Sequence, residues 1–402
     1  MIIRSDLHIH SLYSMATSKN MDIKTIASQA KFKGLDLVGT GDAFHPEWLQ
    51  IIEDSTEPLK DGIYSIGNCD HNTQTRLLKS VETPEIESGL CKFILTVEVE
   101  DKDRVHQLIV LPSIESAYEI RENLPSKNID KEGRPRVEMD GNELMQLIRD
   151  YSGLIGPSHA FTPWTSIYKE FNSIYDCYDD TPDFLELGLS ADTDVADRIE
   201  ELQDIPFISN SDAHSPWPHR LGREFNEIEI KKMTFKAFKD AIKAKKVVGN
   251  YGFDPRLGKY HETGCVRCYK AYSIEEARKL KMRCPCGGLI KIGVKDRISD
   301  IAEWDEPHHP DFRPQYTHIL PLTEIISLVY EKGITTVFVQ KIWKEMVQKF
   351  GSEIGCLIYA PISEVRKTDP KLADVIKSFR ENTLKIQPGA GGMYGKIILD
   401  EK

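Results

Sequence analysis

A chain of 402 residues is long enough to bury a sizeable core and to divide into two or three domains. No stretch approaches the ~20 consecutive apolar residues that a membrane-spanning helix requires. The first residues, MIIRSDLHIH, carry charge too early for a secretory signal peptide. These observations exclude a helical membrane protein and predict a cytoplasmic one.

The charge of the chain is unevenly distributed. Residues 231–297 hold 18 Lys and Arg against 6 Asp and Glu, a local balance of +12 in a chain whose net charge is −11. A basic stretch beside an acidic region is typical of an enzyme that acts on a polyanion. A solvated basic helix is the alternative, and it explains KKMTFKAFKDAIKAKK at 231–246 better than it explains the whole stretch.

Residues 1 to about 210 alternate short apolar runs with amphipathic helical segments, the pattern of a parallel sheet or barrel built from βα units. The pattern predicts a strand at 2–9, a helix across NMDIKTIASQAKFKG that begins near Asn20 or Asp22 and stops at Gly34, and a buried strand in LDLVGTGD. Further strands are expected in KFILTVEVE, RVHQLIVLP, SGLIGPSHA, PDFLELGL and IPFISNSDAH, and helices in GNELMQLIRDY and DVADRIEEL. The polar, proline-containing tract at 121–140 predicts an exposed loop.

Histidines and carboxylates recur at the ends of these predicted strands. His8 and His10 point the same way, because side chains alternate between faces along an extended strand. In a βα barrel the C-terminal strand ends converge on one face, where active sites are built, and packing alone does not explain polar residues there. The sequence therefore predicts a multinuclear metal centre among the residues so placed, which are His8, His10, Asp42, Glu98, His106, His159, Glu186, Asp212 and His214.

The ordered motifs of this half resemble those of the polymerase-and-histidinol-phosphatase (PHP) superfamily. They are DLHIHS at 6–11, GTGD at 39–42, VE at 97–98, SH at 158–159 and SDAH at 211–214. The resemblance implies an α/β fold, a distorted (βα)7 barrel that hydrolyses phosphoesters at a trinuclear metal site. It implies zinc at that centre, with Mg²⁺ or Mn²⁺ as alternatives.

The resemblance also implies a role for each ligand. The first metal would be held by the four residues expected to be catalytic, which are His8, His10, Glu98 and Asp212. Glu98 would bridge to a second metal bound by His106 and His159. A third would take His214 with Asp42 or His45. Many relatives have histidines where this chain has Ala16 and Ala43.

Four of the eight cysteines crowd into residues 265–286, as Cys265-x2-Cys268 and Cys284-x-Cys286. In a reducing compartment two close pairs of thiols predict a structural zinc ribbon rather than disulfides. The second pair is one residue shorter than the usual C-x2-C, which leaves a contribution from His261 or an unusual knuckle as alternatives. The scattered cysteines, expected to be buried thiols, are Cys69, Cys91, Cys177 and Cys356.

The second half narrows the resemblance. A PHP-like barrel followed by DPRLGKYHETGC, the ribbon, HPDFRP and PGAGGMYGKI is similar along essentially the whole chain to the archaeal endonuclease Q family. This implies a DNA repair endonuclease that cuts double- or single-stranded DNA on the 5′ side of deaminated bases (uracil, hypoxanthine, xanthine) and of abasic sites. Some archaeal members bind the sliding clamp through a short C-terminal motif. Residues 395–402, GKIILDEK, show no aromatic clamp-binding box, which leaves that partner open.

The expected organisation is a PHP barrel at 1–228, a basic connecting helix and zinc ribbon at 229–300, and a helical and mixed C-terminal region at 301–402 that contacts DNA. Residues past the metal-bearing strand ends, and Tyr394 in the glycine-rich PGAGGMYGK, are candidates to bind DNA or an everted base. Loop anchoring by the rings, surface ion pairs of the arginines with Glu224 or Glu227, and a plain glycine turn are the structural alternatives. The candidates are Trp48, Phe161, Trp164, Tyr168, Glu186, Trp217, Arg220, Arg223 and Tyr394.

Two other functions fit parts of the sequence. A small-molecule phosphatase of the histidinol-phosphate type needs the barrel but neither the ribbon nor the basic stretch. A non-catalytic DNA-binding protein with a degenerate PHP barrel does not need the near-complete ligand set. Salt-dependent DNA binding separates the phosphatase from the other two functions, and metal-dependent nicking separates the endonuclease from the DNA-binding protein.

Overall fold

The computed structural model describes residues 1–66, 76–86 and 89–399. Cys69 lies outside these ranges, whereas Cys91, Cys177 and Cys356 are buried free thiols as predicted. Among the described helices, none has the length and apolar character needed to cross a bilayer.

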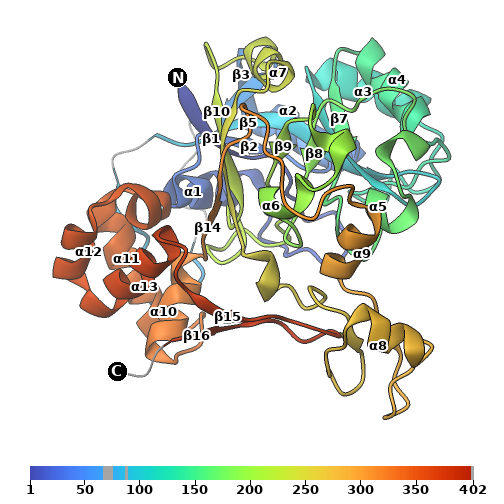
Figure 1. Ribbon diagram of the computed structural model, residues 1–402. Helices are drawn as coiled ribbons and strands as arrows, with labels where there is room; N and C mark the ends of the chain where they lie inside the picture. Colours follow the sequence, from blue (N-terminus) through green and yellow to red (C-terminus); the bar gives the residue numbers. More distant parts are fainter. Residues whose placement is uncertain (67–75, 87–88, 400–402) are drawn as a thin grey trace.

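One large mixed sheet organises the first part of the chain (Figure 1). Within the described residues it has ten strands, of which β1, β2 and β5 are parallel neighbours and β6 and β7 continue from β5 as antiparallel neighbours. A separate parallel pair, β8 and β9, stands beside β7. The strands are β1 (Ile2–Asp6), β2 (Leu37–Gly39), β3 (Thr56–Lys60), β4 (Ile63–Ile66), β5 (Lys92–Glu100), β6 (His106–Leu111), β7 (Leu154–Pro157), β8 (Leu185–Glu186), β9 (Phe207–Ile208), β10 (Phe225–Glu229), β11 (Val247–Gly252) and β14 (Tyr316–His318).

The expectation of an all-parallel pattern fails at β6. Only residues 101–105 separate β5 from β6, and a parallel connection needs a crossover of a dozen or more residues. The antiparallel register places His106 opposite Glu100. His106, at the start of β6, therefore lies at the same end of the sheet as the residues at the end of β5.

Backbone hydrogen bonds continue the strands into a ring. Ala160 N donates to Glu186 O at 2.8 Å, linking the end of β7 to β8, and His10 N donates to Ala213 O at 3.0 Å, linking the segment after β9 to the end of β1. One hydrophobic cluster unites side chains from strands around the ring, including Leu7, Leu37, Ile94, Leu108, Leu154 and Ile208. The chain therefore wraps one core and brings its strand ends together.

The predicted helices form where their signals lie. Asp22 caps the first by accepting a hydrogen bond from Thr25 N at 2.9 Å, and Gly34 ends it in a left-handed conformation with φ 97°. The segment expected as a helix at 194–202 forms only a short helix and a 3-10 turn at Glu200–Leu202. The helices of this part are α1 (Ile23–Lys33), α2 (Pro46–Ser55), α3 (Ile114–Asn123), α4 (Gly141–Asp150), α5 (Ile167–Glu170) and α6 (Thr193–Ala196).

The sheet continues through residue 228, because β10 pairs with β1 on one side and with β11 on the other. The basic helix α7 (Phe235–Lys243) lies between β10 and β11 in the chain. Its apolar face, with Phe238 and Ile242, packs into the same core as Leu7. This helix is amphipathic, with its lysines turned outward from a buried face.

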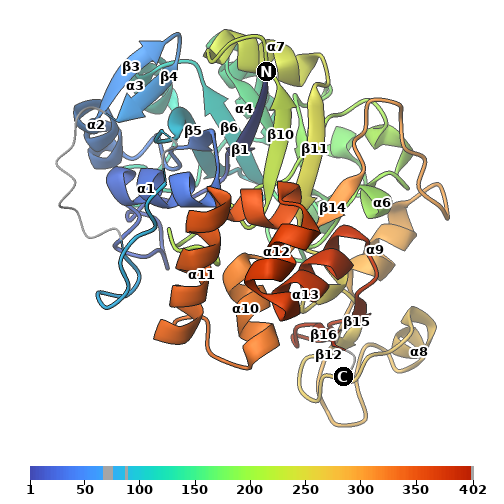
Figure 2. The same ribbon diagram turned by 90° about the vertical axis from the view of Figure 1, so that its left-hand side faces the viewer.

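The rest of the chain forms a small cysteine-containing lobe and a helical region (Figure 2). The lobe contains β12 (Gly264–Cys265), α8 (Ile274–Lys279) and β13 (Ile290–Lys291), and α9 (Val294–Ile301) follows it. The helical region has its own core and a hairpin that extends toward the lobe. Its elements are α10 (Leu322–Tyr330), α11 (Val337–Phe350), α12 (Ile362–Thr368), α13 (Pro370–Arg380), β15 (Lys385–Gln387) and β16 (Lys396–Ile398).

The glycines of PGAGGMYGK serve this hairpin. Gly391 has φ +59°, and a Cβ there would lie 2.4 Å from the carbonyl oxygen of Cys265. Glu262 N also donates to Gly389 O at 3.0 Å. The turn needs glycine because it packs closely against the backbone of the cysteine lobe. This agrees with the plain glycine turn, one of the structural alternatives.

A buried ion pair joins the helical region to α1. Lys33 Nζ lies 2.7 Å from Glu353 Oε1 and also donates to Pro218 O at 2.7 Å. Trp343 Nε1 donates to the other oxygen of Glu353 at 2.7 Å. Both charged side chains are at most 3% exposed. Each polar atom is thus partnered at a contact between regions distant in sequence.

Replacing Lys33 by Met should destabilise this contact strongly, because Glu353 would then be a buried charge without its counterion. Breaking a buried pair from one side costs roughly 3–5 kcal/mol of unfolding free energy. Denaturant unfolding monitored by tryptophan fluorescence would measure it. Lys24→Met, at an exposed position of the same helix, should change stability by less than about 0.5 kcal/mol. Equal stability of both variants would contradict the assigned role.

Candidate metal centre

The predicted ligands meet at one end of the ring of strands. Among the described residues, seven of them form three groups, and within each group the ligand atoms lie within 4.8 Å of one another. Two groups share Glu98 and two share His10, so the groups adjoin. Each group could hold a metal ion. The groups are His8, His10 and Glu98; Glu98, His106 and His159; and His10, Asp212 and His214.

The backbone turns sharply where several of these side chains leave their strands. Asp42, His159 and Asp212 have φ of 50°, 31° and 46°, in the left-handed region that L-residues rarely adopt. Each follows a strand, at the point where the chain reverses over the end of the sheet. Such conformations persist only where the surrounding structure enforces them, and they concentrate at functional sites.

Glu98 stands at the middle of the centre. Its Oε1 lies 2.8 Å from His106 Nδ1 and 2.9 Å from His159 Nε2, and its Oε2 lies 3.5 Å from His10 Nε2. Burial alone would raise the pKa of Glu98, but the charges of His106 and His8 and hydrogen bonds from the imidazoles hold it well below its usual range. The carboxylate is therefore ionised and faces several imidazoles, which is the donor set of a bridging ligand.

The imidazoles leave room for a cation. His8 Nε2 and His106 Nε2 are buried and make no hydrogen bond with any described residue, with the nearest carboxylate oxygens, of Glu98 and Glu100, 3.5 and 3.6 Å away. Orphaned buried nitrogens are costly, and coordination would satisfy them. Asp212 closes the group on the open side, with 34% of its side chain exposed. Hydrogen bonding and charge from His10 and His8 hold its pKa well below the usual range, against the effect of burial. The residues present fit a metal centre.

Two predicted site residues orient ligands. Glu186, a candidate for substrate contact, is buried with Oε2 2.9 Å from His8 Nδ1 and also accepts from His159 N at 2.8 Å. Asp42, an expected third-metal ligand, accepts from Ser11 N at 2.7 Å and lies 3.1 Å from His10 Nδ1. Both carboxylates fix an imidazole from behind, as the outer partners of metal ligands do.

His45 likewise stands apart from the three groups. It caps helix α2, where its Nδ1 accepts from Trp48 N at 3.4 Å, and its ring stacks on Tyr13 at 4.2 Å. Neither His45 nor Asp42, the residues expected to join His214 on a third metal, belongs to the group of His214, whose neighbours there are His10 and Asp212.

Most of the aromatic candidates prove to be buried anchors. Trp48 is fully buried and its Nε1 donates to Gly41 O at 2.9 Å, while Phe161 and Tyr168 stack on each other at 5.1 Å. Trp217 is also buried. The burial of these four rings favours loop anchoring, the structural alternative, over stacking on DNA, although Phe161 and Tyr168 also line a cavity of about 420 Å³ beside Trp164. Trp164 and Tyr394 are 56% and 67% exposed.

Arg220 and Arg223 line a cavity of about 630 Å³ together with Phe253, Glu324 and Tyr394. Arg223 Nε donates to Ser211 O at 2.9 Å, next to the metal-centre residue Asp212. No ion pair joins either arginine to Glu224 or Glu227 in the described part of the chain. The cavity lies between the ring of strands and the C-terminal region.

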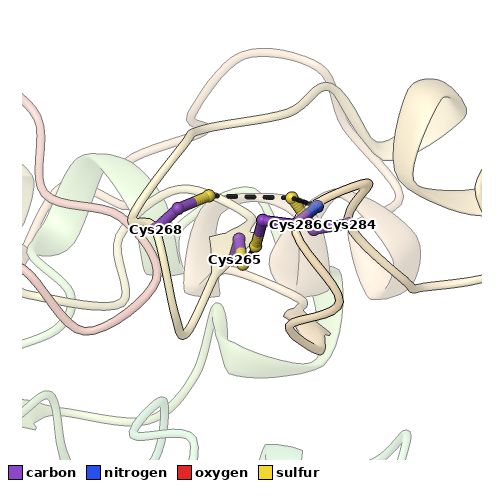
Figure 3. A group of neighbouring side chains, drawn as sticks. All are labelled: Cys265, Cys268, Cys284 and Cys286. Carbon is purple, nitrogen blue, oxygen red and sulfur yellow. Dashed lines mark hydrogen bonds between the residues drawn. The ribbon is translucent and has the colours of Figure 1, made fainter.

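The four clustered cysteines face one another across the small lobe (Figure 3). Cys265 Sγ lies 3.5 Å from Cys286 Sγ, and Cys268 Sγ lies 3.6 Å from Cys284 Sγ. A hydrogen bond from Tyr272 lowers the pKa of Cys284 to about 6. A tetrad of this kind could hold a metal ion, and His261 is not part of it.

The short Cys284-x-Cys286 spacing closes because two glycines follow it. Gly287 has φ +85°, and a Cβ on Gly288 would lie 2.6 Å from Cys265 Sγ. The chain can therefore fold back tightly beside the sulfurs. The unusual knuckle is the alternative that the structure favours.

Sequence reasoning missed Arg134. Its Nη1 lies 3.1 Å from Glu98 Oε2, although the tract at 121–140 was expected to be an exposed loop. Val137 in that tract is fully buried and Ile129 nearly so. The sequence signal available was the Gly133-Arg134-Pro135 tripeptide inside a polar tract, and a local pattern does not show that it contacts a distant glutamate.

Comparison with known proteins places the chain among relatives. A family model described as the MJ0043 C-terminal domain matches residues 321–383. The uncharacterized protein MJ0043 of Methanocaldococcus jannaschii is 52% identical over 254 residues, which are 61% of this chain and 32% of that protein. The chain thus spans about a third of that relative. The uncharacterized protein YqxK of Bacillus subtilis is 31% identical over 98% of this chain and 99% of its own length.

Two solved structures match the whole chain. The lesion-specific endonuclease PfuEndoQ from Pyrococcus furiosus is 46% identical with a TM-score of 0.91, covering 100% of this chain and 96% of that one. An endonuclease Q bound to a 27-mer duplex substrate with an abasic lesion at its active site is 46% identical with a TM-score of 0.89, covering 100% and 97%. The chain belongs to the endonuclease Q family.

Proposed function

We propose that this chain is a metal-dependent DNA repair endonuclease that hydrolyses the phosphodiester on the 5′ side of deaminated bases and abasic sites. The observation that carries the proposal is the set of three adjoining ligand groups around Glu98 and His10. It stands in a chain that matches a lesion-specific endonuclease at 46% identity over its full length. Neither a small-molecule phosphatase nor a degenerate barrel explains the complete centre together with the cysteine lobe.

The ring of strands supports a PHP-type barrel as the catalytic unit. We assign residues 1–228 to it, together with α7, β11 and β14, which share its core or its sheet. The zinc ribbon lies within 229–300, and 301–402 holds the C-terminal region that contacts DNA. Zinc is the proposed ion of the ribbon, because four thiolates in two close pairs suit it. Zinc is also proposed at the catalytic centre, with Mg²⁺ or Mn²⁺ as alternatives at this mixed imidazole and carboxylate site.

Metal ions held by His8, His10, Glu98, His106, His159, Asp212 and His214 would activate a water molecule and stabilise the oxygens of an in-line displacement. The chain's own residues prepare this chemistry. Glu186 and Asp42 fix the rings of His8 and His10, so that their Nε2 atoms face Glu98. The sharp turn at Asp212 presents a carboxylate at the open side of the centre.

The exposed rings and positive charges support a DNA path across the open face. Lys291 Nζ lies 2.9 Å from the centroid of the exposed Trp164 ring, and Lys259 Nζ lies 5.5 Å from that of Tyr394. Rings flanked by cations suit both the bases and the phosphates of DNA. Trp164, Tyr394, Arg220 and Arg223 remain the proposed substrate contacts.

Asp212→Asn should lower the cleavage rate by more than about a hundredfold, since the amide keeps the shape of the carboxylate but removes its charge from the metal centre. DNA binding and thermal stability should stay close to those of the wild type. Cleavage of a lesion-bearing duplex, fluorescence anisotropy and thermal unfolding would measure the three quantities. Asp103→Asn, in the exposed loop between β5 and β6, is the matched control and should cleave normally. Normal turnover by Asp212→Asn would refute the assignment.

Cys265→Ser or Cys286→Ser should release one tightly bound zinc ion. Zinc binding to such a tetrad contributes roughly 10–16 kcal/mol, which is then folding free energy of the lobe. Elemental analysis should show one zinc fewer, hydrogen exchange should increase across 256–300, and DNA binding should weaken. Cys177→Ser removes a buried cysteine outside the tetrad and should keep the full zinc content. Unchanged zinc in both ribbon variants would contradict the tetrad.

Lesion choice is tested with end-labelled duplexes that carry one uracil, one hypoxanthine, one abasic site or none. A deaminated base presents a carbonyl oxygen where an amino group stood, so a pocket of N–H donors would reject the normal base at a cost of ~1–3 kcal/mol, or one to two powers of ten in rate. We expect a single nick immediately 5′ to the lesion that leaves a 3′-hydroxyl. Equal cutting of all duplexes, or base release without strand scission, would show that the proposal is wrong.

A further inference from the structure

The segment between α3 and α4 is built onto the metal centre. Glu100 N donates to Pro135 O and Val137 N donates to Glu100 O, both at 2.9 Å, so residues 135–137 run along the end of β5. On the other side, Met15 N donates to Glu132 Oε1 at 2.8 Å. The segment is thus fixed to two elements that carry metal-centre residues.

Gly133 brings this segment close to the centre. A Cβ at this position would lie 2.3 Å from Asp42 Oδ2 and 2.5 Å from Ser14 Oγ, so a larger residue would collide with the group that orients His10. Arg134 follows directly and Pro135 restricts the backbone after it. The position of Arg134 is therefore set by close packing.

Arg134 is the cation that touches the bridging carboxylate. Its Nη1 lies 3.1 Å from Glu98 Oε2, and a quarter of its side chain is exposed. It also lines a cavity of about 440 Å³. A guanidinium carries five N–H donors, and within the described ranges Glu98 is the hydrogen-bond acceptor found for this one. Donors remain that can bind a group entering the cavity.

The other charged side chains that line this cavity and form ion pairs or hydrogen bonds have partners outside the metal centre. Glu100 pairs with Arg136 at 2.7 Å and Glu138 with Lys127 at 3.6 Å. Glu132 accepts the hydrogen bond from Met15 N. Arg134 differs from these residues, because its counterion is Glu98, and metal ions bound to Glu98 would neutralise that carboxylate.

The position of Arg134 implies an anion. With metal ions on Glu98, a guanidinium beside them adds positive charge to positive charge, which is unfavourable at short range and low solvent exposure. An anion bound between the guanidinium and the centre removes this repulsion. A planar guanidinium fits phosphate oxygens, and the substrate of the proposed endonuclease brings a phosphodiester to this place.

We propose that Arg134 binds a non-bridging oxygen of the phosphodiester that is cut, and that it is a catalytic residue in the sense of touching the reacting group. The inference rests on the proposed function and adds a residue that sequence motifs did not identify. The acids at the rim keep the neighbouring cations engaged, so the guanidinium of Arg134 is the one directed to the scissile phosphate.

Sulfur substitution at the scissile phosphate tests this contact. Duplexes with the Rp or the Sp phosphorothioate and the all-oxygen duplex would be cut in single turnover by wild type, Arg134→Ala and Arg134→Lys. We expect Arg134→Ala to be slower by about a hundredfold on the oxygen substrate. The sulfur effect is the ratio of the cleavage rates of the oxygen and the phosphorothioate duplex. In Arg134→Ala it should largely disappear for one diastereomer and stay unchanged for the other. Arg134→Lys, with its charge but without the planar fork, should lie between the two enzymes.

Two measurements besides activity accompany the rates. Metal content should be the same in wild type and Arg134→Ala. In the Asp212→Asn background, Arg134→Ala should reduce the slope of log binding constant against log salt by about one, the value for one phosphate contact. Arg136→Ala, two residues away and paired with Glu100, is the matched control, and it should keep the wild-type sulfur effects at saturating enzyme.

The inference fails if Arg134→Ala cleaves at the wild-type rate, or if it is slow with both sulfur effects unchanged. It also fails if the variant loses metal ions, since Arg134 would then act through Glu98 and not on the phosphate. Absence of cleavage by the wild type on every lesion duplex would instead refute the proposed function itself. The wild-type reactions therefore separate the two failures.

Discussion

The buried carboxylate of Glu98 is the group on which the rest of the site depends. A buried charge is costly unless it is paired, and here the pairing comes from imidazoles of several strands. His106 reaches Glu98 because β5 and β6 run antiparallel. His159 reaches it because β7 runs antiparallel to β6 and so ends beside the start of that strand. The register of these strands is therefore a requirement of the site as well as of the core.

A second set of carboxylates supports the first. Glu186 and Asp42 stand behind His8 and His10, and each is itself hydrogen-bonded by backbone or hydroxyl groups. Asn210 Nδ2 donates to Glu186 at 2.8 Å, and Ser14 Oγ donates to Asp42 at 2.9 Å. Rings held from both sides have little freedom to turn, so the ligand atoms are in place before any ion or DNA arrives.

The sequence predicted those features that depend on local order. Asp22 and Gly34 mark the ends of α1 because capping acts within one turn, and the cysteine pairs mark the small lobe because their spacing is short. Burial was harder to predict. Trp48 follows a predicted metal-bearing strand end, yet its ring is buried and anchors a loop. The sequence around a tryptophan does not tell whether the fold covers its ring. Arg134 was missed since its partner lies 36 residues away.

The glycine turn of the β15–β16 hairpin has a mechanical consequence. The cysteine lobe is held by the covalent chain at both of its ends and also by this turn, through Glu262 N to Gly389 O and the close approach of Gly391 to Cys265. A lobe with a third attachment point is less free to rotate than one held only by its two chain connections. The helical region thereby constrains the orientation of the lobe relative to the metal centre, and the DNA path proposed across both would be formed before DNA binds.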